Sequence, residues 1–465
     1  MAEPRRLDPT ILREYDIRGV VGKSLTTRDA EAIGHAFGLQ VTRQPTNFGR
    51  PRVCVGYDGR LSSPDMEQGL VTGLSAAGVD ALRVGLGPTP MLYFAVHEFK
   101  ADGGIMVTGS HNPPDYNGFK FMLGINPFFG EQIQELGALA AAPPEFSGEL
   151  GQADRRTVFE AYVARLAATY EAPNGLRVAW DAGNGATGDA LVALAARLPG
   201  EHILLNETID GTFPVHHPDP TQPENLEQVI EAVATRKCDA GIAFDGDGDR
   251  IGVIDSTGQI LWGDQLMAIF AAELLARQPG ATIIADVKAS KTLFDEIAKL
   301  GGTPLMWRTG HSLIKQKMAE TGAPLAGEMS GHIFFADRYY GFDDALYAAV
   351  RLLDIVARSP DSLADMRSRL PATVNTPELR FDCADQRKFD VIDEVRERLA
   401  QDGANVNDID GVRVTTADGW WLLRASNTQP VLVARCESDD TAGLDQLKNA
   451  LVDQLTQSGV EPPDF

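Results

Sequence analysis

The sequence of 465 residues predicts an α/β protein with three similar βαβ-type domains, whose mixed sheets are mostly parallel, and a smaller C-terminal α+β domain. Three observations carry this prediction. Strand-like and helix-like stretches alternate, the same pattern recurs three times, and it changes after about residue 370. Strands that alternate with helices are typical of βαβ units. At roughly 150 residues per domain, the length allows three or four domains.

The repeated unit begins with an apolar strand that ends in Asp, at residues 53–58, 178–181 and 283–286. A helix-like stretch follows each strand, at residues 64–77, 188–198 and 291–300. A second strand comes next, at residues 81–84, 202–205 and 303–307. Each unit closes with a strand that runs into a polar loop, at residues 101–108, 238–245 and 323–328. Ligands of parallel sheets bind beyond the carboxyl ends of the strands, which is where these three loops are expected.

The C-terminal part has a different plan. Its expected elements are a strand at 378–381, a helix at 389–401, strands at 411–414, 420–424 and 431–437, and a helix at 443–457. This order indicates a smaller α+β domain. We predict domains at residues 1–153, 154–259, 260–370 and 371–465, around a central cleft.

The composition favours a cytoplasmic protein. No apolar run follows the N-terminal Arg5-Arg6 pair, so we expect no secretory signal. The apolar stretch at 266–276 is too short for a bilayer, which needs about 20 residues. The four cysteines are far apart, as expected for reduced thiols. The net charge of −23 disfavours nucleic acid and anionic membranes as partners, and it means that an anionic substrate needs local cations.

The first polar loop carries a candidate nucleophile. It reads T-G-S-H-N-P at residues 108–113, with Ser110 beside a glycine at a strand end and Lys120 ten positions later. A serine nucleophile needs a base or a charge partner. The alternative is a turn in which Ser110 only caps a helix. A serine-hydrolase site is disfavoured because the G-x-S-x-G elbow is absent.

The second polar loop reads D-G-D-G-D-R at residues 245–250 and predicts a metal site. Its glycines allow a tight turn in which Asp245, Asp247 and Asp249 converge. Converging carboxylates need a cation between them, and hard oxygen ligands favour Mg²⁺ or Ca²⁺. An EF-hand is excluded because Arg250 and Ser256 stand where it requires Gly and Glu. Three carboxylates leave room for a phosphate oxygen, as in phosphoryl transfer. The alternative is a solvated acidic hairpin.

The third polar loop reads G-E-M-S-G-H at residues 327–332. Glu328 and Ser330 are suited to binding two neighbouring sugar hydroxyls, and His332 is suited to proton transfer near neutral pH. A plain polar turn is the alternative.

A fourth segment, R-A-S-N-T-Q-P at residues 424–430, combines one cation with several hydrogen-bond donors. Arg424, Ser426, Asn427 and Thr428 suit a phosphate oxyanion, and the alternative is a turn between strands with an incidental arginine. Basic residues also stand at the other motifs: Arg18 after Tyr15, Lys120, Arg250 and Lys288. One site at the junction of four domains would combine them.

A competing motif lies at residues 183–188, where G-N-G-A-T-G matches G-x-G-x-x-G after a strand, with Glu207 near the place of a ribose-binding acid. This pattern is typical of dinucleotide-binding oxidoreductases. Such an enzyme would leave the other four loops unexplained, so we expect the glycines to serve a strand-to-helix turn. Saturable binding of NAD⁺ or NADP⁺ would reverse this interpretation.

The four motifs in this order resemble those of the α-D-phosphohexomutase superfamily and are most similar to those of its bacterial phosphomannomutase/phosphoglucomutase group. The resemblance covers nearly the whole chain, from Tyr15 to the C-terminal domain. It implies an isomerase that interconverts hexose 6-phosphate and hexose 1-phosphate, with mannose or glucose as the sugar. The reaction would run through a phosphoserine and a hexose 1,6-bisphosphate around a central active-site cleft. The four domains would be the phosphoserine, metal-binding, sugar-binding and phosphate-binding domains.

The resemblance also implies roles for single residues. Ser110 would carry the phosphate, and Mg²⁺ would bridge that phosphate to Asp245, Asp247 and Asp249. The residues beside the phosphoserine would be Arg18, Lys120 and Arg250, and the candidates for proton transfer would be Lys120 and His332. The residues around the sugar would be Tyr15, Lys288, His311, Glu328 and Ser330. The phosphate that is not reacting would be bound by Arg424, Ser426, Asn427 and Thr428. Met329 resembles the mannose and glucose group rather than the phosphoglucosamine mutases. A non-catalytic phosphosugar-binding protein stays an alternative, and the oligomeric state is not predicted.

Overall fold

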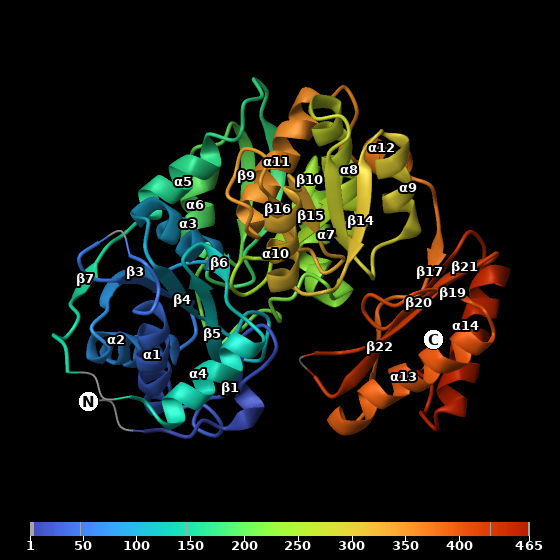
Figure 1. Cartoon of the computed structure of the whole chain (residues 1–465). Helices are drawn as coiled ribbons and strands as arrows, with labels where there is room; N and C mark the ends of the chain where they lie inside the picture. Colours follow the sequence, from blue (N-terminus) through green and yellow to red (C-terminus); the bar gives the residue numbers. More distant parts are fainter. Residues whose placement is uncertain (1–3, 47, 145–146, 428, 464–465) are drawn as a thin grey trace.

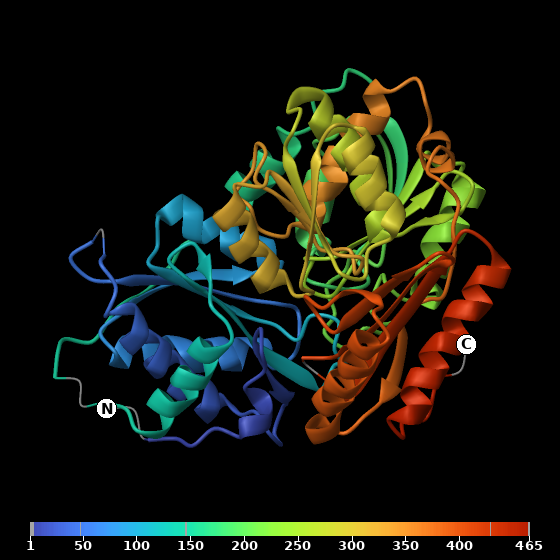
Figure 2. The same cartoon turned by 45° about the vertical axis from the view of Figure 1, so that its right-hand side comes forward.

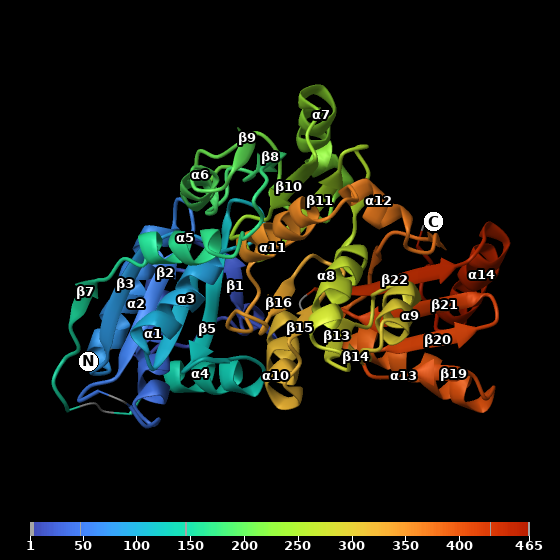
Figure 3. The same cartoon turned by 90° about the horizontal axis from the view of Figure 1, so that it is seen from above.

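The protein consists of four units, each built on its own β-sheet, in a computed structural model that describes residues 4–46, 48–144, 147–427 and 429–463. Figure 1 shows the first unit (blue) and the C-terminal unit (red) on opposite sides, with the second and third units above them. Seen from above in Figure 3, the C-terminal unit lies next to the third unit and away from the first.

The first unit contains a seven-stranded sheet with the order β1-β5-β4-β2-β3-β7, in which β6 pairs with β5. Its helices α1 and α2 pack closely together because glycines on both helices face the other's backbone. The bounds are β1 (Ile17–Val20), α1 (Thr27–Val41), β2 (Arg52–Tyr57), α2 (Ser63–Ala76), β3 (Asp80–Leu86), α3 (Thr89–Phe99), β4 (Gly103–Val107), β5 (Tyr116–Leu123), β6 (Asn126–Pro127), α4 (Glu131–Ala141) and β7 (Ala153–Arg155).

The second and third units have sheets of five and four strands, with the orders β12-β11-β10-β8-β9 and β14-β13-β15-β16. The second unit contains α5 (Phe159–Ala167), β8 (Leu176–Asp181), α6 (Gly188–Ala195), β9 (Gly200–Leu205), α7 (Glu227–Arg236), β10 (Ala240–Phe244), β11 (Ile251–Asp255) and β12 (Ile260–Leu261). The third contains α8 (Gly263–Arg277), β13 (Thr282–Asp286), α9 (Lys291–Lys299), β14 (Thr303–Trp307), α10 (His311–Thr321), β15 (Leu325–Gly327), β16 (Ile333–Phe335), α11 (Ala345–Arg358) and α12 (Leu363–Ser368).

The three units share one strand order, which confirms the repeat expected from the sequence. In each unit the first strand of the repeat lies between the second and the third, and all three are parallel. A fourth strand then pairs antiparallel with the third. The loops that begin at Thr108, Asp245 and Glu328 therefore occupy equivalent positions, between the third and the fourth strand.

The C-terminal unit has an antiparallel sheet with the order β17-β22-β21-β20-β19, in which β18 also pairs with β22. Helices α13 and α14 pack against its central strands, as Figure 2 shows. Two very short strands, β17 and β19, lie outside the sequence prediction. The bounds are β17 (Val374–Asn375), β18 (Leu379–Asp382), α13 (Asp385–Gln401), β19 (Asn405–Asn407), β20 (Val412–Thr416), β21 (Gly419–Ala425), β22 (Val431–Ser438) and α14 (Thr441–Gln457).

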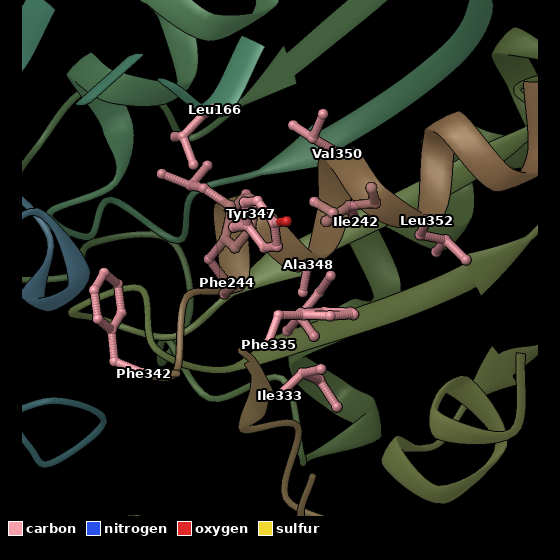
Figure 4. Packing of buried hydrophobic residues seen from close by; sticks show 14 of the residues in the cluster. Leu166, Ile242, Phe244, Ile333, Phe335, Phe342, Tyr347, Ala348, Val350 and Leu352 are labelled. Atoms are coloured by element: carbon pink, nitrogen blue, oxygen red, sulfur yellow. The ribbon is translucent and has the colours of Figure 1, made fainter. Parts of the chain in front are cut away.

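One hydrophobic core spans the first three units, and the C-terminal unit has a separate core. The first unit also has a second cluster of its own around α1 and α2. The residues of the shared core come from all three units and lie between Cys54 and Leu363 in the sequence. Figure 4 shows part of it, where Ile242 and Phe244 of the second unit lie near Tyr347 and Leu352 of the third. The C-terminal core is formed by a separate cluster on β18 to β22, α13 and α14. The predicted fold class is confirmed.

Two further expectations concern the environment of the protein. The four cysteines are buried and free of disulfides. Across the described ranges, none of the helices has both the length and the apolar character that crossing a bilayer requires. The cytoplasmic location and the domain boundaries at 153, 259 and 370 stay predictions.

Candidate active site

A cavity of about 530 Å³ lies where the four units meet, a volume within the range of small-molecule sites. All four sequence motifs contribute to its wall. Among the described residues, seven arginines and lysines but only four carboxylates line the cavity. The whole chain, by contrast, carries a net charge of −23. The predicted site residues on the wall are Tyr15, Arg18, Ser110, Lys120, Arg250, Lys288, His311, Glu328, Ser330, His332, Arg424, Ser426 and Asn427. The local positive charge that an anionic substrate requires is therefore present.

Ser110 lies at the end of β4 in a left-handed backbone conformation, with φ of 48°. The residue is buried, and its Oγ donates a 2.8 Å hydrogen bond to Asp245 Oδ2. Oγ also lies 3.2 Å from His111 Nδ1. A non-glycine residue in this conformation is uncommon and persists only where the surroundings hold it. The hydroxyl is thus fixed against the acidic loop of another unit.

Arg60 holds the Ser110 loop from beneath. Its buried guanidinium donates to four backbone carbonyls, those of Ser110, Asn112, Pro113 and Tyr116, at 2.5 to 2.9 Å. A side chain at Gly109 would collide with this guanidinium, because a Cβ there would lie 2.4 Å from it. The sequence analysis missed Arg60. The only sequence signal was an arginine two residues after the strand-end Asp58.

The strand-end aspartates of the repeat also support these loops. Asp58 accepts a hydrogen bond from the Gly109 N–H at 3.1 Å. At the equivalent position of the third unit, Asp286 accepts one from the Met329 N–H at 3.1 Å. The repeated Asp therefore braces the loop after the third strand in both units.

The acidic loop is completely buried. Asp245, Asp247 and Asp249 each have zero exposure. The Oδ1 of Asp245 accepts three backbone N–H groups, those of Gly248, Asp249 and Arg250, at 3.0 to 3.1 Å. Burial, followed by the charges of Asp247 and Asp249, raises the pKa of Asp245 well above its usual value. The cluster therefore needs positive charge to stay ionised.

Lys120 supplies part of that charge. Its Nζ bonds to Asp247 at 2.7 Å and to Asp249. Burial opposes the lysine charge, but the charges of Asp247 and Asp249 outweigh it and raise the pKa of Lys120 well above its usual value. Thr89, at the start of α3, donates its hydroxyl to Asp247 at 2.5 Å. Thr89 is a second residue that the sequence analysis missed.

The acidic loop fits a hard divalent cation. Oxygen atoms of the three carboxylates all lie within 4.8 Å of one another. The Oδ1 atoms of Asp247 and Asp249 are buried without a hydrogen-bond partner. Buried carboxylate oxygens are costly unless they are paired or bound to metal, and a set of oxygen ligands alone suits Mg²⁺ or Ca²⁺. The chemistry of the residues present thus agrees with the predicted metal site.

His332 lies between a guanidinium and a carboxylate. Arg250 Nε donates to its Nε2 at 3.0 Å, so Nε2 carries the lone pair. Its Nδ1 lies 3.1 Å from Asp343 Oδ2, close enough for the Nδ1 proton to face that carboxylate. Asp343 is fully buried and also bonds to Lys315 at 3.1 Å, while His311 stacks near His332 with ring centroids 5.6 Å apart. The sequence analysis missed Asp343, which follows no motif.

The loop at residues 327–332 is organised around Glu328. This carboxylate accepts the Gly310 N–H at 2.9 Å and the Ser330 hydroxyl at 3.0 Å. Lys288 reaches into the same cavity and bonds to Glu378 of the C-terminal unit at 2.8 Å. Glu378 is a further residue that sequence reasoning missed, although it is the first residue of the strand predicted at 378–381 and directly precedes β18.

The Arg424 loop enters the cavity from the C-terminal unit. Arg424 Nε bonds to Asp410 at 3.0 Å. Asn427 donates to the Tyr15 hydroxyl at 2.7 Å, and that hydroxyl donates to the Thr309 carbonyl at 2.9 Å. Tyr15 therefore connects the first, third and fourth units across the cavity. Thr428, the remaining predicted residue, lies outside the described residues.

Comparison with known families agrees with this geometry. Four models, described as phosphoglucomutase/phosphomannomutase alpha/beta/alpha domains I, II and III and C-terminal domain, match residues 9–141, 160–258, 262–374 and 378–454. A phosphomannomutase/phosphoglucomutase of Pseudomonas putida is 45% identical over 99% of this chain and 98% of its own length. The chain belongs to the phosphoglucomutase/phosphomannomutase family.

Two other members illustrate the range of this family. A phosphoglucomutase of Neisseria gonorrhoeae is 42% identical over 94% of this chain and 95% of its own length. The crystal structure of a phosphoglucomutase/phosphomannomutase family protein from Burkholderia thailandensis superposes with a TM-score of 0.92 at 44% identity, covering 98% of this chain and all of the other. The chain is therefore an α-D-phosphohexomutase, an isomerase of the intramolecular phosphotransferase class.

Membership in the phosphohexomutase superfamily also decides the meaning of the G-N-G-A-T-G segment. The segment packs against the acidic loop, since the Ala186 N–H donates to the Gly246 carbonyl at 2.9 Å. A Cβ at Gly185 would lie 2.9 Å from the Gly246 carbonyl oxygen, and one at Gly188 would lie 2.0 Å from the Glu207 carbonyl oxygen. The glycines thus allow a strand-to-helix turn and close backbone packing.

Proposed function

We propose that the chain interconverts hexose 6-phosphate and hexose 1-phosphate, with glucose and mannose phosphates as substrates. The reaction passes through a phosphorylated Ser110 and a hexose 1,6-bisphosphate. One observation carries the proposal. Ser110 bonds to the acidic loop at 2.8 Å, and the Arg424 loop lines the same cavity from a different unit. Either end of the sugar must be able to face the reactive centre. The site therefore needs one reactive centre and a separate group of residues that binds the phosphate at the other end.

The reactive centre is Ser110 with the charges around it. Arg18 bonds to Asn112 of the same loop at 2.6 Å, and Lys120 and Arg250 contribute two more cations. Asp245, Asp247 and Asp249 hold Mg²⁺, which neutralises phosphate charge when bound. Phosphoryl transfer depends mainly on positioning and charge neutralisation. These residues supply both.

Proton transfer to and from the sugar hydroxyl falls to His332, with Lys120 as the second candidate. The Nε2 lone pair of His332 is available on the cavity wall once Arg250 turns to the phosphate. Nδ1 lies 3.1 Å from Asp343 Oδ2, so a proton on that nitrogen would face a carboxylate. Lys120 is tied to two carboxylates and keeps its charge in this state.

Substrate binding is divided between two loops. Glu328 and Ser330 bind sugar hydroxyls, with Lys288, His311 and Tyr15 around the ring. Arg424, Ser426 and Asn427, together with Thr428, bind the phosphate that does not react. Arginine suits this role because its planar donors match phosphate oxygens.

The deciding experiment compares turnover of glucose 1-phosphate, mannose 1-phosphate and glucosamine 1-phosphate by one enzyme preparation. We expect the first two to be converted faster than the third, with a trace of glucose 1,6-bisphosphate as activator. A chelator should abolish turnover and added Mg²⁺ should restore it. Dominant glucosamine activity would overturn the substrate assignment, and full activity in chelator would overturn the metal assignment.

A further inference from the structure

The C-terminal unit grips the backbone of the loop that carries Lys288. Three successive carbonyls of this loop accept hydrogen bonds from two buried arginines of the C-terminal unit. Arg413 donates to Val287 at 2.6 Å and to Ala289 at 2.8 Å, and Arg435 donates to Lys288 itself. These carbonyls lie in the short turn between β13 and α9, outside the strand and the helix, and buried backbone groups of this kind need such partners.

The two arginines are themselves fixed by packing. Arg413 lies over the Trp420 ring at 3.6 Å, and Arg435 is 5.7 Å from the same ring. Trp420 packs with Val287 and Leu422 in a small apolar cluster between the units. Its indole N–H donates to Glu437, which also accepts the Ser290 hydroxyl at 2.9 Å. The backbone on either side of Lys288 is therefore attached to the C-terminal sheet.

The same unit also holds the end of the Lys288 side chain. Nζ bonds to Glu378 Oε2 at 2.8 Å, and Asp286 of its own unit is farther away, at 3.7 Å. The Oε1 of Glu378 accepts the Arg380 Nε at 2.8 Å. Arg380 and Glu378 both line the cavity. Lys288 belongs to the third unit in sequence, yet its backbone and its amine are placed by the fourth.

We propose that Arg413, Arg435 and Glu378 are positioning residues for Lys288, so that its ammonium reaches the substrate only when the C-terminal unit is docked. The proposal rests on the proposed function in one respect, the role of Lys288 on the sugar side. The docked C-terminal unit thus has two roles. It provides the Arg424 loop that binds the non-reacting phosphate, and it places Lys288 of the third unit beside the sugar. Misplacement of a binding group by about 1 Å costs roughly 100-fold in rate.

A double-mutant cycle tests the proposal. Arg413→Leu should lower kcat/KM for glucose 1-phosphate by roughly 10- to 100-fold in the wild-type background. In a Lys288→Met background the same change should cost less than about 3-fold, because the residue it positions is gone. Arg413→Lys, which keeps the charge but loses the planar guanidinium over Trp420, should restore part of the loss. Arg396→Leu is the matched control, since Arg396 is half-exposed and bonds to Asp393 on the outer helix α13.

A second readout does not depend on turnover. The rate at which a small acylating reagent modifies the Lys288 amine, measured by peptide mass spectrometry, should rise several-fold in Arg413→Lys and in Glu378→Gln. The exposed Lys299 serves as the internal reference.

Equal losses of kcat/KM from Arg413→Leu in both backgrounds, or an unchanged acylation rate in both variants, would overturn the proposal. If Arg413→Leu does not fold, Arg413→Lys takes its place in the cycle with the same criterion. Failure of the proposed function is recognised separately, because the wild-type enzyme would then not convert glucose 1-phosphate while the acylation readout would still respond.

Discussion

Two interfaces hold the four units together, and they are built differently. We call them the core seam and the C-terminal seam. The core seam joins the first three units through one continuous hydrophobic core. The C-terminal seam joins the fourth unit through the small cluster of Val287, Trp420 and Leu422, and otherwise through polar contacts. Apolar burial contributes roughly 25 cal/mol per Å², so a large shared core resists separation far more than a small cluster does. The chain also connects the fourth unit by a single short link after α12.

The placement of the site follows this difference. Ser110 and the acidic loop lie on the core seam, where reacting atoms must keep a fixed geometry. The Arg424 loop lies on the C-terminal seam, whose hydrogen bonds can be exchanged with substrate or water at low cost. Rotation of the C-terminal unit would let an intermediate turn between its two phosphates. Equal scattering radii of the protein with and without glucose 1,6-bisphosphate would count against such a motion.

The largest expected effect concerns the reactive centre on the core seam. Ser110→Ala should reduce turnover by at least about 1000-fold, or roughly 4 kcal/mol, because no carrier remains for the phosphate. Calorimetric affinity for glucose 1-phosphate should stay within about 3-fold, since the Arg424 grip is intact. Ser368→Ala, on the exposed end of α12, is the control. Retained turnover in Ser110→Ala would contradict the phosphoserine assignment.

The next effect compares the seams by their stability. Leu352→Ala in the shared core should lower the free energy of unfolding by about 2–5 kcal/mol, because Leu352 is fully buried. Leu422→Ala at the C-terminal seam should instead loosen the fourth unit and speed protease cleavage in the link at residues 369–373. Denaturant unfolding and limited proteolysis measure the two effects. Identical behaviour of both variants would show that the seams are not distinct.

A smaller effect distinguishes binding of the non-reacting phosphate from the phosphoryl-transfer step. Arg424→Lys should lower kcat/KM by about 10- to 100-fold, mostly through KM, because lysine cannot present two parallel donors to phosphate. The level of Ser110 phosphorylation, followed by intact-protein mass, should not change. A fall in kcat with unchanged KM would place Arg424 at the reactive centre instead.

The smallest effect is a pH dependence within the second unit. His216 bonds to the buried Asp181 at 2.9 Å, and this hydrogen bond raises the pKa of His216 above its usual value of about 6.5. The stabilisation is complete below pH 6.5 and is lost as the pH rises through the higher folded-state pKa. Wild-type stability relative to His216→Asn should therefore decline across that window, by about 1 kcal/mol or less. A flat difference in chemical denaturation from pH 5.5 to 8.5 would refute this coupling.

Much of the fold and many of the site loops were predictable from local pattern. The strand predicted at 53–58 is β2, and the helix predicted at 291–300 is α9. The helix predicted to start at residue 389 starts at Asp385, because its charged first turn shows no apolar periodicity. Most of the thirteen predicted residues that line the cavity lie in or beside short motifs in which several polar residues stand together.

Most of the missed residues act on a segment far away in the sequence. Arg60 supports the Ser110 loop about fifty residues later, and Glu378 holds Lys288 from ninety residues away. Asp343 follows Phe342 in a loop without a motif, yet it is fully buried beside His332. Nothing in a single sequence distinguishes such a charge from a surface charge, because only the fold decides which charges lose their water.

The sequence by itself determined the repeat, the order of the polar loops and the chemistry that each loop can perform, because hydrophobic periodicity and motif spacing are local properties. The tertiary structure decided which loops face one another and how firmly each is held. Ser110 meets Asp245 across 135 positions, and Lys288 is completed by a unit that begins more than eighty residues later. Such pairs form because burial of the shared core brings the strand ends together, and that burial depends on the whole chain at once.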